Sequence, residues 1–311
     1  MHVISRRRFI RQGAAALLAT KTLAACAAGG SLPRGVLPIG LQLYTVQDEL
    51  DKDLAGALQK IASIGYREVE LPPLLKYRAS EMKSALDQAG LACPSVGFAG
   101  TELQTRLDEC IEYTLKVGAQ FMICMGPWVA DEKERLQPEQ DMLAAYSKFF
   151  ASFTLEDWKS NAEFLNKMGE RAKAAGLQFG YHNHSMEFRA YGAVVAYDLL
   201  LEATDPALVT LELDCGWAAH AGRDPAALLT QHAGRYRLLH IKDIQRNSKP
   251  STDIYIRTTE VGSGAIDWTG VLRAAKKTGV QHCFVEQEPP FRIPPLEAIR
   301  VSYEYLRGVE I

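Results

Sequence analysis

Acidic residues, histidines and a lysine follow four apolar segments of the 311-residue chain, and their types suit metal binding. Carboxylate oxygens and imidazole nitrogens are donors that Mn²⁺, Co²⁺, Mg²⁺ or Zn²⁺ accept, whereas Cu(I) and iron–sulfur clusters need sulfur ligands. One such residue alone usually caps a segment or hydrogen-bonds, but four sets in succession predict a site for one divalent ion. The four sets are Tyr181-His182-Asn183-His184 with Glu187, Glu212-Leu213-Asp214, His240-Ile241-Lys242-Asp243 and Glu286-Gln287-Glu288.

These residues can meet only if the apolar segments before them are neighbouring strands. Short apolar segments alternate with amphipathic ones from Ile39 to the C-terminus, which is typical of repeated βα units. The predicted strands are 39–44, 68–71, 92–96, 120–125, 178–182, 208–213, 236–241 and 282–286. The predicted helices are 54–64, 80–89, 102–117, 155–175, 194–203, 225–232, 268–277 and 296–306, and several end at a glycine.

Eight such units predict an α/β chain with one (β/α)8 TIM barrel over residues 39–311, after a linker at 27–38. A sheet that binds a dinucleotide would show a glycine-rich turn after its first strand, and Gly40-Leu41-Gln42-Leu43 has none. In a barrel the polar residues that end the strands converge over one face. The longer connections 128–154 and 245–267 follow strands and are expected on that face, as a lid or substrate wall. The alternative is a peripheral addition or a contact between copies of a homo-oligomer.

The chain resembles the sugar phosphate isomerase/epimerase family of xylose isomerase-like TIM barrels. The resemblance covers essentially everything after Pro38, and the ordered set of motifs is far more specific than any one of them. The motifs are Leu41-Gln42-Leu43-Tyr44-Thr45-Val46, Gly65-Tyr66-Arg67-Glu68-Val69-Glu70-Leu71, Tyr181-His182-Asn183-His184, Leu213-Asp214, His240-Ile241-Lys242-Asp243, Glu260-Val261-Gly262-Ser263-Gly264 and Val285-Glu286.

The resemblance implies a divalent metal held by an acidic residue of strand five and by residues of strands six, seven and eight. Asp214, His240 and Glu286 match the last three positions. At strand five the chain departs from the family pattern, because His182 stands where relatives such as ketose 3-epimerases carry Glu. Either His182 ligates the metal through nitrogen or Glu187, just beyond it, takes the position. The loss of one carboxylate would lower the negative charge of the site and alter its metal preference.

The family's chemistry is proton transfer at a carbon next to a carbonyl. A metal that binds the substrate's oxygens makes this proton easier to remove, and a carboxylate takes it. Return of the proton gives a sugar isomerase or epimerase, whereas loss of a β-substituent would make the protein a lyase or hydratase of 3-keto-glycosides. Glu286 is the first candidate for the base and Glu187 the second acid–base group. Ligation or salt bridging without proton transfer is the alternative for both residues.

Further residues are candidates for contact with a sugar or keto-sugar. The family pattern places a cation after strand seven, where Lys242 and Arg246 stand, although a surface salt bridge is an alternative role. His184 would contact the substrate or orient a metal ligand. Packing is an equal alternative for the remaining three candidates, which are Tyr44, Glu70 and Trp217.

The first 26 residues differ from the rest in charge. They carry five basic residues and no acidic one, whereas the remainder holds 30 Lys and Arg against 37 Asp and Glu, a net charge of about −7. Ser5-Arg6-Arg7-Arg8-Phe9-Ile10-Arg11 looks like a twin-arginine motif, and Leu23-Ala24-Ala25-Cys26 looks like a bacterial lipobox. These features predict a signal peptide, twin-arginine export to the periplasm and an anchor at Cys26. A Sec signal with incidental arginines, or a buried helix with a chance cysteine, is the alternative.

The net negative charge of the residues after position 26 indicates which kind of partner the protein binds. An acidic body predicts no nucleic-acid partner, because binding to a phosphate backbone needs clustered Lys and Arg. It also disfavours an abasic-site endonuclease, an activity of related barrels that needs more ligands for three metal ions. A non-catalytic lipoprotein that binds carbohydrate is the alternative from another functional class. In both cases the expected partner is a small sugar.

Overall fold

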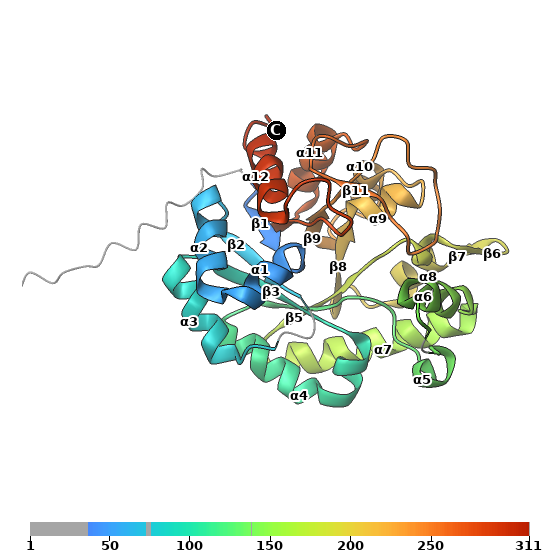
Figure 1. Cartoon of the computed structure of the whole chain (residues 1–311). Coiled ribbons are helices and arrows are strands. Elements are labelled where there is room, and N and C mark those ends of the chain that lie inside the picture. The colour runs from blue at the N-terminus through green and yellow to red at the C-terminus, as the bar shows by residue number, and fades with distance from the viewer. Residues whose placement is uncertain (1–36, 73–75, 138, 311) are drawn as a thin grey trace, which may run out of the picture. The chain divides into compact units, whose positions relative to one another are not determined.

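The computed structural model describes residues 37–72, 76–137 and 139–310. Eight parallel strands close into a barrel (Figure 1), which confirms the predicted (β/α)8 architecture. The signal segment 1–26, with Cys26, lies outside the described residues. In order around the barrel the strands are β1 (Ile39–Gln42), β12 (His282–Val285), β9 (Tyr236–Ile241), β8 (Val209–Asp214), β5 (Gln178–His182), β4 (Phe121–Cys124), β3 (Ala92–Phe98) and β2 (Glu68–Leu71).

The eight segments predicted as strands all form barrel strands, because each carries apolar side chains that the barrel buries on both faces. The first strand ends earlier than predicted, at Gln42. The Gln42 side chain accepts a hydrogen bond from the backbone N–H of Tyr44, at 3.0 Å, and the chain turns into the 3-10 helix η1 (Leu43–Val46). This turn places Tyr44 over the end of the barrel rather than within a strand.

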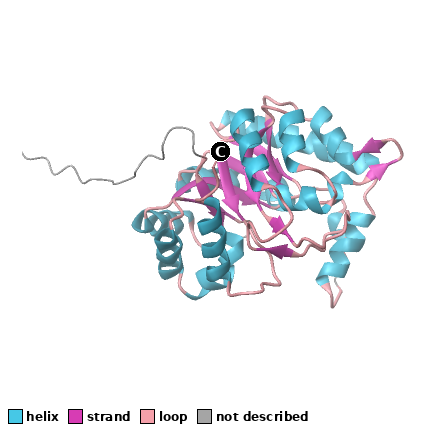
Figure 2. Ribbon diagram, turned by 90° about the horizontal axis from the view of Figure 1, so that it is seen from above, coloured by secondary structure: helices cyan, strands magenta, loops and turns pink. Residues whose placement is uncertain are grey.

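Helices surround the strands (Figure 2), and they follow the predicted amphipathic segments closely. Gly90 and Gly118 end two of them with φ of 70° and 85°, a conformation that glycine adopts without strain. The helices that match predicted segments are α2 (Leu54–Ile64), α3 (Ala79–Ala89), α4 (Gly100–Val117), α7 (Leu155–Ala174), α8 (Ala196–Ala203), α10 (Pro225–Gln231), α11 (Trp268–Thr278) and α12 (Pro295–Leu306).

One predicted helix starts too early. Residues 194 and 195 do not begin α8 but form strand β7 (Val194–Val195), which pairs antiparallel with β6 (Ala190–Tyr191). The β-branched Val194 and Val195 favour the extended backbone, and Gly192, with φ of 66°, makes the turn between the two strands. The 3-10 helix η2 (Met186–Phe188) stands between β5 and this hairpin.

Shorter elements occupy the connections around the site. The helices α1 (Gln47–Lys52) and α9 (Cys215–His220) follow the ends of β1 and β8, and the connection 128–154 contains α5 (Glu132–Arg135) and α6 (Met142–Ala151). The connection after β9 contains the antiparallel pair β10 (Asp243–Ile244) and β11 (Thr258–Thr259). Among the described residues, no helix combines the length and apolar character that a membrane span requires.

The Gly262–Gly264 part of this connection is held by one carboxylate. Asp243 Oδ2 accepts hydrogen bonds from the backbone N–H groups of Gly262 and Gly264 and from the indole N–H of Trp268, at 2.9 to 3.1 Å. A side chain at position 264 would collide with Asp243, since its Cβ would lie 2.1 Å from Oδ1. The two glycines therefore shape the loop around Asp243.

Candidate metal centre

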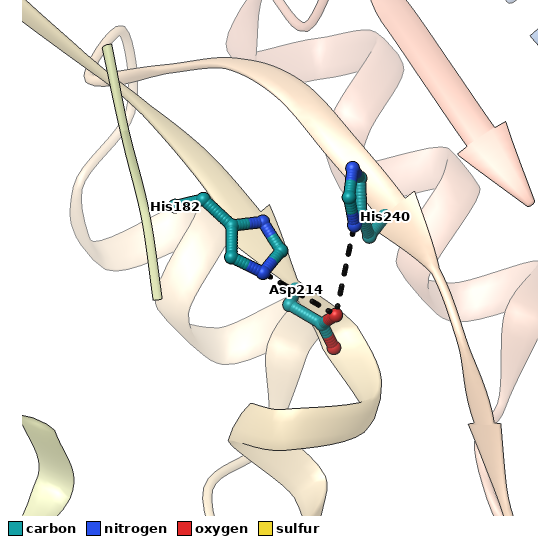
Figure 3. A group of neighbouring side chains, drawn as sticks. All are labelled: His182, Asp214 and His240. Carbon is teal, nitrogen blue, oxygen red and sulfur yellow. Dashed lines mark ion pairs between the residues drawn. The ribbon is translucent and has the colours of Figure 1, made fainter. Parts of the chain in front are cut away.

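Three residues from consecutive barrel strands meet at the carboxyl end of the barrel. His182 ends β5, Asp214 ends β8 and His240 lies one residue before the end of β9. Figure 3 shows the two imidazoles on either side of the Asp214 carboxylate, whose Oδ2 is 3.8 Å from Nε2 of His182 and 3.8 Å from Nδ1 of His240. All three side chains are buried.

Glu286 completes the group from the eighth strand. It follows β12 directly, and its Oε2 lies 2.7 Å from Nδ1 of His240. The four atoms that converge are therefore Nε2 of His182, Oδ2 of Asp214, Nδ1 of His240 and Oε2 of Glu286; we call them the candidate metal site.

The local structure of β8 and α9 fixes the orientation of Asp214. Its Oδ1 accepts a hydrogen bond from the backbone N–H of Trp217 at 2.7 Å and so caps the N-terminus of α9. Its own backbone N–H donates to Oδ1 of Asn183, at 3.1 Å. With Oδ1 engaged in this way, Oδ2 is the oxygen that faces the two histidines.

Two further carboxyl groups, Glu70 and Glu212, contact the opposite sides of the two imidazole rings; we call this pair the carboxyl layer. Oε2 of Glu212 is 3.1 Å from Nδ1 of His182 and 3.3 Å from Nε2 of His240, and Oε1 of Glu70 is 2.7 Å from the same Nε2. Gln42 donates to Oε1 of Glu70 at 2.7 Å. Since each ring turns one nitrogen to this layer, the other nitrogen faces Asp214, which is the arrangement of metal-binding histidines in many metalloproteins.

The alternation of side chains along β8 explains why both layers exist. Glu212 and Asp214 are two residues apart, so their side chains point to the same side of the sheet, into the barrel. Glu70, Glu212 and His240 also have ligand-like spacing with one another. Because His240 presents only Nε2 to them and Nδ1 to Asp214 and Glu286, its two nitrogens serve different partners.

Lys242 brings a positive charge to the site. Its buried ammonium is 2.8 Å from Oδ2 of Asp214, 2.9 Å from Oε2 of Glu286 and 2.5 Å from Oε1 of Glu288, and it lies 5.2 Å from the centre of the Trp217 ring. A side chain at Gly216 would exclude it, since a Cβ there would lie 2.7 Å from Cγ of Lys242. The position of Lys242 thus depends on a glycine in α9.

Burial and charge move the pKa values in different directions. Burial raises the pKa of Asp214 to about 6, although Lys242 opposes the shift, and burial together with Glu70 raises the pKa of Glu212 well above its ordinary value. Burial also disfavours ionisation of Glu286, but Lys242 and His240 outweigh it and hold the pKa of Glu286 well below its usual range. The site therefore combines a Glu286 that favours the ionised form with a Glu212 that favours the protonated form.

The donor set and its spacing fit a divalent ion. Ligand atoms about 2.0–2.2 Å from one metal lie roughly 3.0–3.6 Å from one another. Asp214 Oδ2 lies 3.8 Å from each of the two imidazole nitrogens, and Glu286 Oε2 lies 2.7 Å from Nδ1 of His240. The ligand atoms of His182, Asp214 and His240 all lie within 4.8 Å of one another. Two imidazole nitrogens and two carboxylate oxygens suit Zn²⁺, Co²⁺ or Mn²⁺ and also admit Mg²⁺. The sulfur of the nearest cysteine in sequence, Cys215, is buried and unpaired, and burial raises the pKa of its thiol well above the ordinary value.

Glu187, the other candidate for the strand-five position, points elsewhere. Its Oε1 accepts a hydrogen bond from the Tyr181 hydroxyl at 2.7 Å, and its Oε2 accepts one from the backbone N–H of His184 at 3.0 Å. Burial raises the pKa of Glu187 to about 7. The structure thus gives Glu187 partners in the β5–η2 turn, whereas it brings His182 to Asp214 and His240.

Two cavities lie over the site. The smaller, about 220 Å³, is lined by His182, Lys242, Glu286 and Glu288 and by His184 and Tyr44; we call it the polar cavity. The larger, about 420 Å³, has Leu143, Tyr146, Phe149 and Phe150 of α6, Trp217 and Ile254 among its lining residues, and we call it the apolar cavity. Both long connections therefore contribute walls beside the metal site.

Some of the other residues predicted from the sequence line the cavities, and others do not. His184, Tyr44, Lys242 and Trp217 line one or both cavities. Glu70 is fully buried in the carboxyl layer and contacts His240 and Gln42. Arg246 is exposed and is not among the described residues that line either cavity.

The sequence motifs contain Glu212, Gln42 and Glu288 but indicate no role for any of the three. Glu212 had a usable signal, since a residue two positions before Asp214 on the same strand must face the same side. The contact of Gln42 with Glu70 crosses from β1 to β2, and that of Glu288 with Lys242 crosses between two connections. The residues of each contact lie in separate segments, so no spacing pattern in the sequence predicts either contact.

Known proteins resemble this chain along nearly its whole length. An inosose dehydratase of Clostridium beijerinckii is 27% identical over 280 residues, which cover 84% of this chain and 91% of that protein. A crystal structure of a sugar phosphate isomerase/epimerase from Parabacteroides distasonis superposes with a TM-score of 0.68 at 23% identity, covering 91% of this chain and 99% of that one. A xylose isomerase-like TIM barrel protein from Mycobacterium smegmatis, in complex with magnesium, has a TM-score of 0.63 at 14% identity and covers 90% and 98%.

The family model described as xylose isomerase-like TIM barrel matches residues 58–309. This match spans seven of the eight barrel strands and all four positions of the candidate metal site. The closed parallel barrel and the residues gathered at its carboxyl end agree with it. The chain belongs to the xylose isomerase-like TIM barrel family.

Proposed function

We propose that this protein is a divalent-metal-dependent isomerase or epimerase that moves a proton at the carbon next to the carbonyl of a sugar or keto-sugar. The observation that carries the proposal is the convergence of His182, Asp214, His240 and Glu286 beneath the polar cavity. The names of the similar proteins, a sugar phosphate isomerase/epimerase and an inosose dehydratase, support a substrate of this class.

His182, Asp214, His240 and Glu286 would hold the metal. A bound Mn²⁺, Co²⁺, Mg²⁺ or Zn²⁺ would polarise the substrate carbonyl and stabilise the negative charge that develops on its oxygen. The carboxyl layer keeps the two imidazoles in one orientation, because both rings hydrogen-bond to it from the side away from Asp214.

Glu286 is the first candidate for the base. It lines the polar cavity and is held ionised by Lys242 and His240, so a carboxylate oxygen is available to a substrate C–H there. Lys242 lines the same cavity and can donate a hydrogen bond to a substrate oxygen. Burial disfavours its charged form, but Asp214, Glu286 and Glu288 outweigh burial and raise the pKa of Lys242 well above its ordinary value.

Elimination is the second candidate, because the relative from Clostridium beijerinckii is named as a dehydratase. It begins with removal of the same proton, and the electron pair then expels a hydroxyl or alkoxyl group from the next carbon instead of taking a proton back. Lys242 or another acid would protonate that leaving group. Isomerisation and elimination therefore need the same site and differ in their product.

Incubation of the metal-loaded protein with keto-sugars in D₂O tests both candidates. Deuterium that enters the carbon next to the carbonyl, with an epimer or isomer formed, supports the first reaction. Release of water or of an aglycone with an unsaturated ketone supports the second. Sugar binding that survives chelation, with no deuterium entering the sugar, would instead show a carbohydrate-binding protein and refute the enzymatic proposal.

We also propose that the protein is exported by the twin-arginine pathway, with Cys26 as the site of lipidation. The Arg6-Arg7-Arg8 run and the Leu23–Cys26 motif support this proposal. That pathway moves folded proteins and so allows metal loading before export. Fractionation of cells that express the wild type or an Arg6→Lys, Arg7→Lys, Arg8→Lys variant tests it, since the variant should stay in the cytoplasm.

A further inference from the structure

The polar cavity and the apolar cavity are neighbours. Met125, His184 and Glu288 line both of them, so the space above the candidate metal site continues into the larger cavity. A molecule bound over the metal would therefore have one end next to the apolar cavity.

Helix α6 makes one wall of the apolar cavity. It contributes four lining residues, Leu143, Tyr146, Phe149 and Phe150. They belong to the connection 128–154, in which the sequence predicted no helix. Leu143 and Tyr146 are 42% and 40% exposed, so two large side chains face solvent beside the site. Apolar groups that gather beside a cavity often mark a binding site.

Other segments add apolar side chains to this cavity, among them Trp217 of α9, Met186 of η2 and Ile254 of the connection after β9. Glu132 and Glu288 contribute carboxyl groups to the lining. These segments are far apart in sequence. Their meeting here, next to His184, produces a cavity with many apolar lining residues that adjoins the polar cavity.

The volumes of the two cavities indicate what size of ligand each can hold. Sites for small molecules usually have volumes of roughly 300–1,000 Å³, and the polar cavity, at about 220 Å³, falls below that range. The two cavities together fall within it. The polar cavity alone thus suits one small polar ring, and a larger ligand would extend past His184.

We propose that the apolar cavity binds an aromatic or apolar aglycone, so that the substrate is a glycoside of the keto-sugar rather than the free sugar. This inference rests on the proposed function, because it takes the sugar ring to lie in the polar cavity. The continuity of the two cavities favours a single extended molecule over a separate protein partner on α6. Its lining includes the aromatic side chains of Tyr146, Phe149, Phe150 and Trp217, which suit a planar ring.

Comparison of 3-keto-glucose with phenyl 3-keto-β-glucoside tests the inference on the full-length, metal-loaded protein. Burial of a phenyl ring corresponds to about a 10- to 100-fold gain, so kcat/KM should be at least tenfold higher for the glycoside. The double variant Leu143→Ala, Tyr146→Ala should lose most of this gain and keep its activity on free 3-keto-glucose within about twofold. Met142→Ala is the matched control, because Met142 is 45% exposed on the same helix and does not line the cavity.

Equal kcat/KM for the two substrates, or an equal loss on both in the double variant, would overturn the inference and leave the proposed function intact. If the wild type processes neither substrate, calorimetry of phenyl β-glucoside binding to the metal-free protein tests whether the apolar cavity binds an aglycone. Binding that weakens about tenfold or more in the double variant, but not in Met142→Ala, supports the aglycone site independently of catalysis. Absence of binding overturns it.

Discussion

The substitution of His182 by alanine tests which residue of the fifth strand binds the metal. The change removes one of four converging donors and leaves Oε2 of Glu212 without its 3.1 Å contact to the ring. Loss of a group that only orients a ligand costs about 10- to 100-fold in metal affinity, so loss of a ligand should cost at least about 100-fold, or roughly 2.7 kcal/mol. Glu187→Gln should leave metal affinity within about threefold, because Glu187 contacts Tyr181 and His184 rather than the candidate metal site.

The two variants should separate in stability as well. An amide at position 187 cannot accept both hydrogen bonds that the carboxylate accepts, and an unsatisfied buried N–H costs about 1–3 kcal/mol. At roughly 2–4 °C per kcal/mol for a domain of this size, the melting temperature of Glu187→Gln should fall by about 2–12 °C. We therefore expect one variant with weak metal binding and another with normal metal binding and a lower melting temperature.

Competition with a chromophoric chelator measures metal affinity, and circular dichroism measures melting. His282→Ala is the matched control, because His282 pairs with Glu68 at the start of β12, away from the site, and its loss should not weaken metal binding. A reversed outcome, with tight binding in His182→Ala and weak binding in Glu187→Gln, would refute the assignment of His182 and return the strand-five position to Glu187.

Two further predictions concern the candidate metal site, and a third concerns Glu187. Asp214→Ala and His240→Ala should each abolish metal retention and turnover with the far-ultraviolet dichroism unchanged, and full activity in either would contradict the site. Lys242→Met should bind metal about tenfold more tightly, since the ammonium no longer competes for Asp214 and Glu286, while turnover falls; calorimetry and kinetics check this. Since the pKa of Glu187 is raised to about 7, the stability that its protonated form contributes is complete below about pH 4.5 and is lost as the pH rises through 7, about 3 kcal/mol in all. The melting temperature of the wild type should therefore fall relative to that of Glu187→Gln between pH 5 and pH 8.5, so that the gap closes or reverses, and a constant gap would contradict the assigned pKa.

The barrel could be predicted because local patterns specify it. The segments 68–71, 178–182 and 236–241 agree with the observed strands to the residue, since a buried parallel strand is a short apolar run that a turn or a helix interrupts. The prediction failed at residues 194–195, where apolar residues fit a helical pattern equally well. These two residues form a strand because they pair with Ala190 and Tyr191, and the local pattern does not reveal that pairing.

Part of the site could be predicted for the same reason. Once the strands are known, the residues that end them must converge, and Asp214, His240 and Glu286 do so. The choice between His182 and Glu187 could not be made, because the two residues are close in sequence and differ only in the direction of their side chains. Arg246 shows the same limit: its position after β9 suits a substrate contact, but its side chain is exposed.

The sequence by itself determined the fold class, the four strand ends that carry chemistry and the kinds of donor atom available, because these depend on residue type and on spacing within one segment. Only the tertiary structure decided the rest: the carboxyl layer beneath the imidazoles, the contact of Lys242 with three carboxylates and the wall that α6 builds beside the site. Each of these depends on the distance between segments that are far apart in the chain. Such distances follow from closure of the barrel and from side-chain packing, which no local pattern encodes.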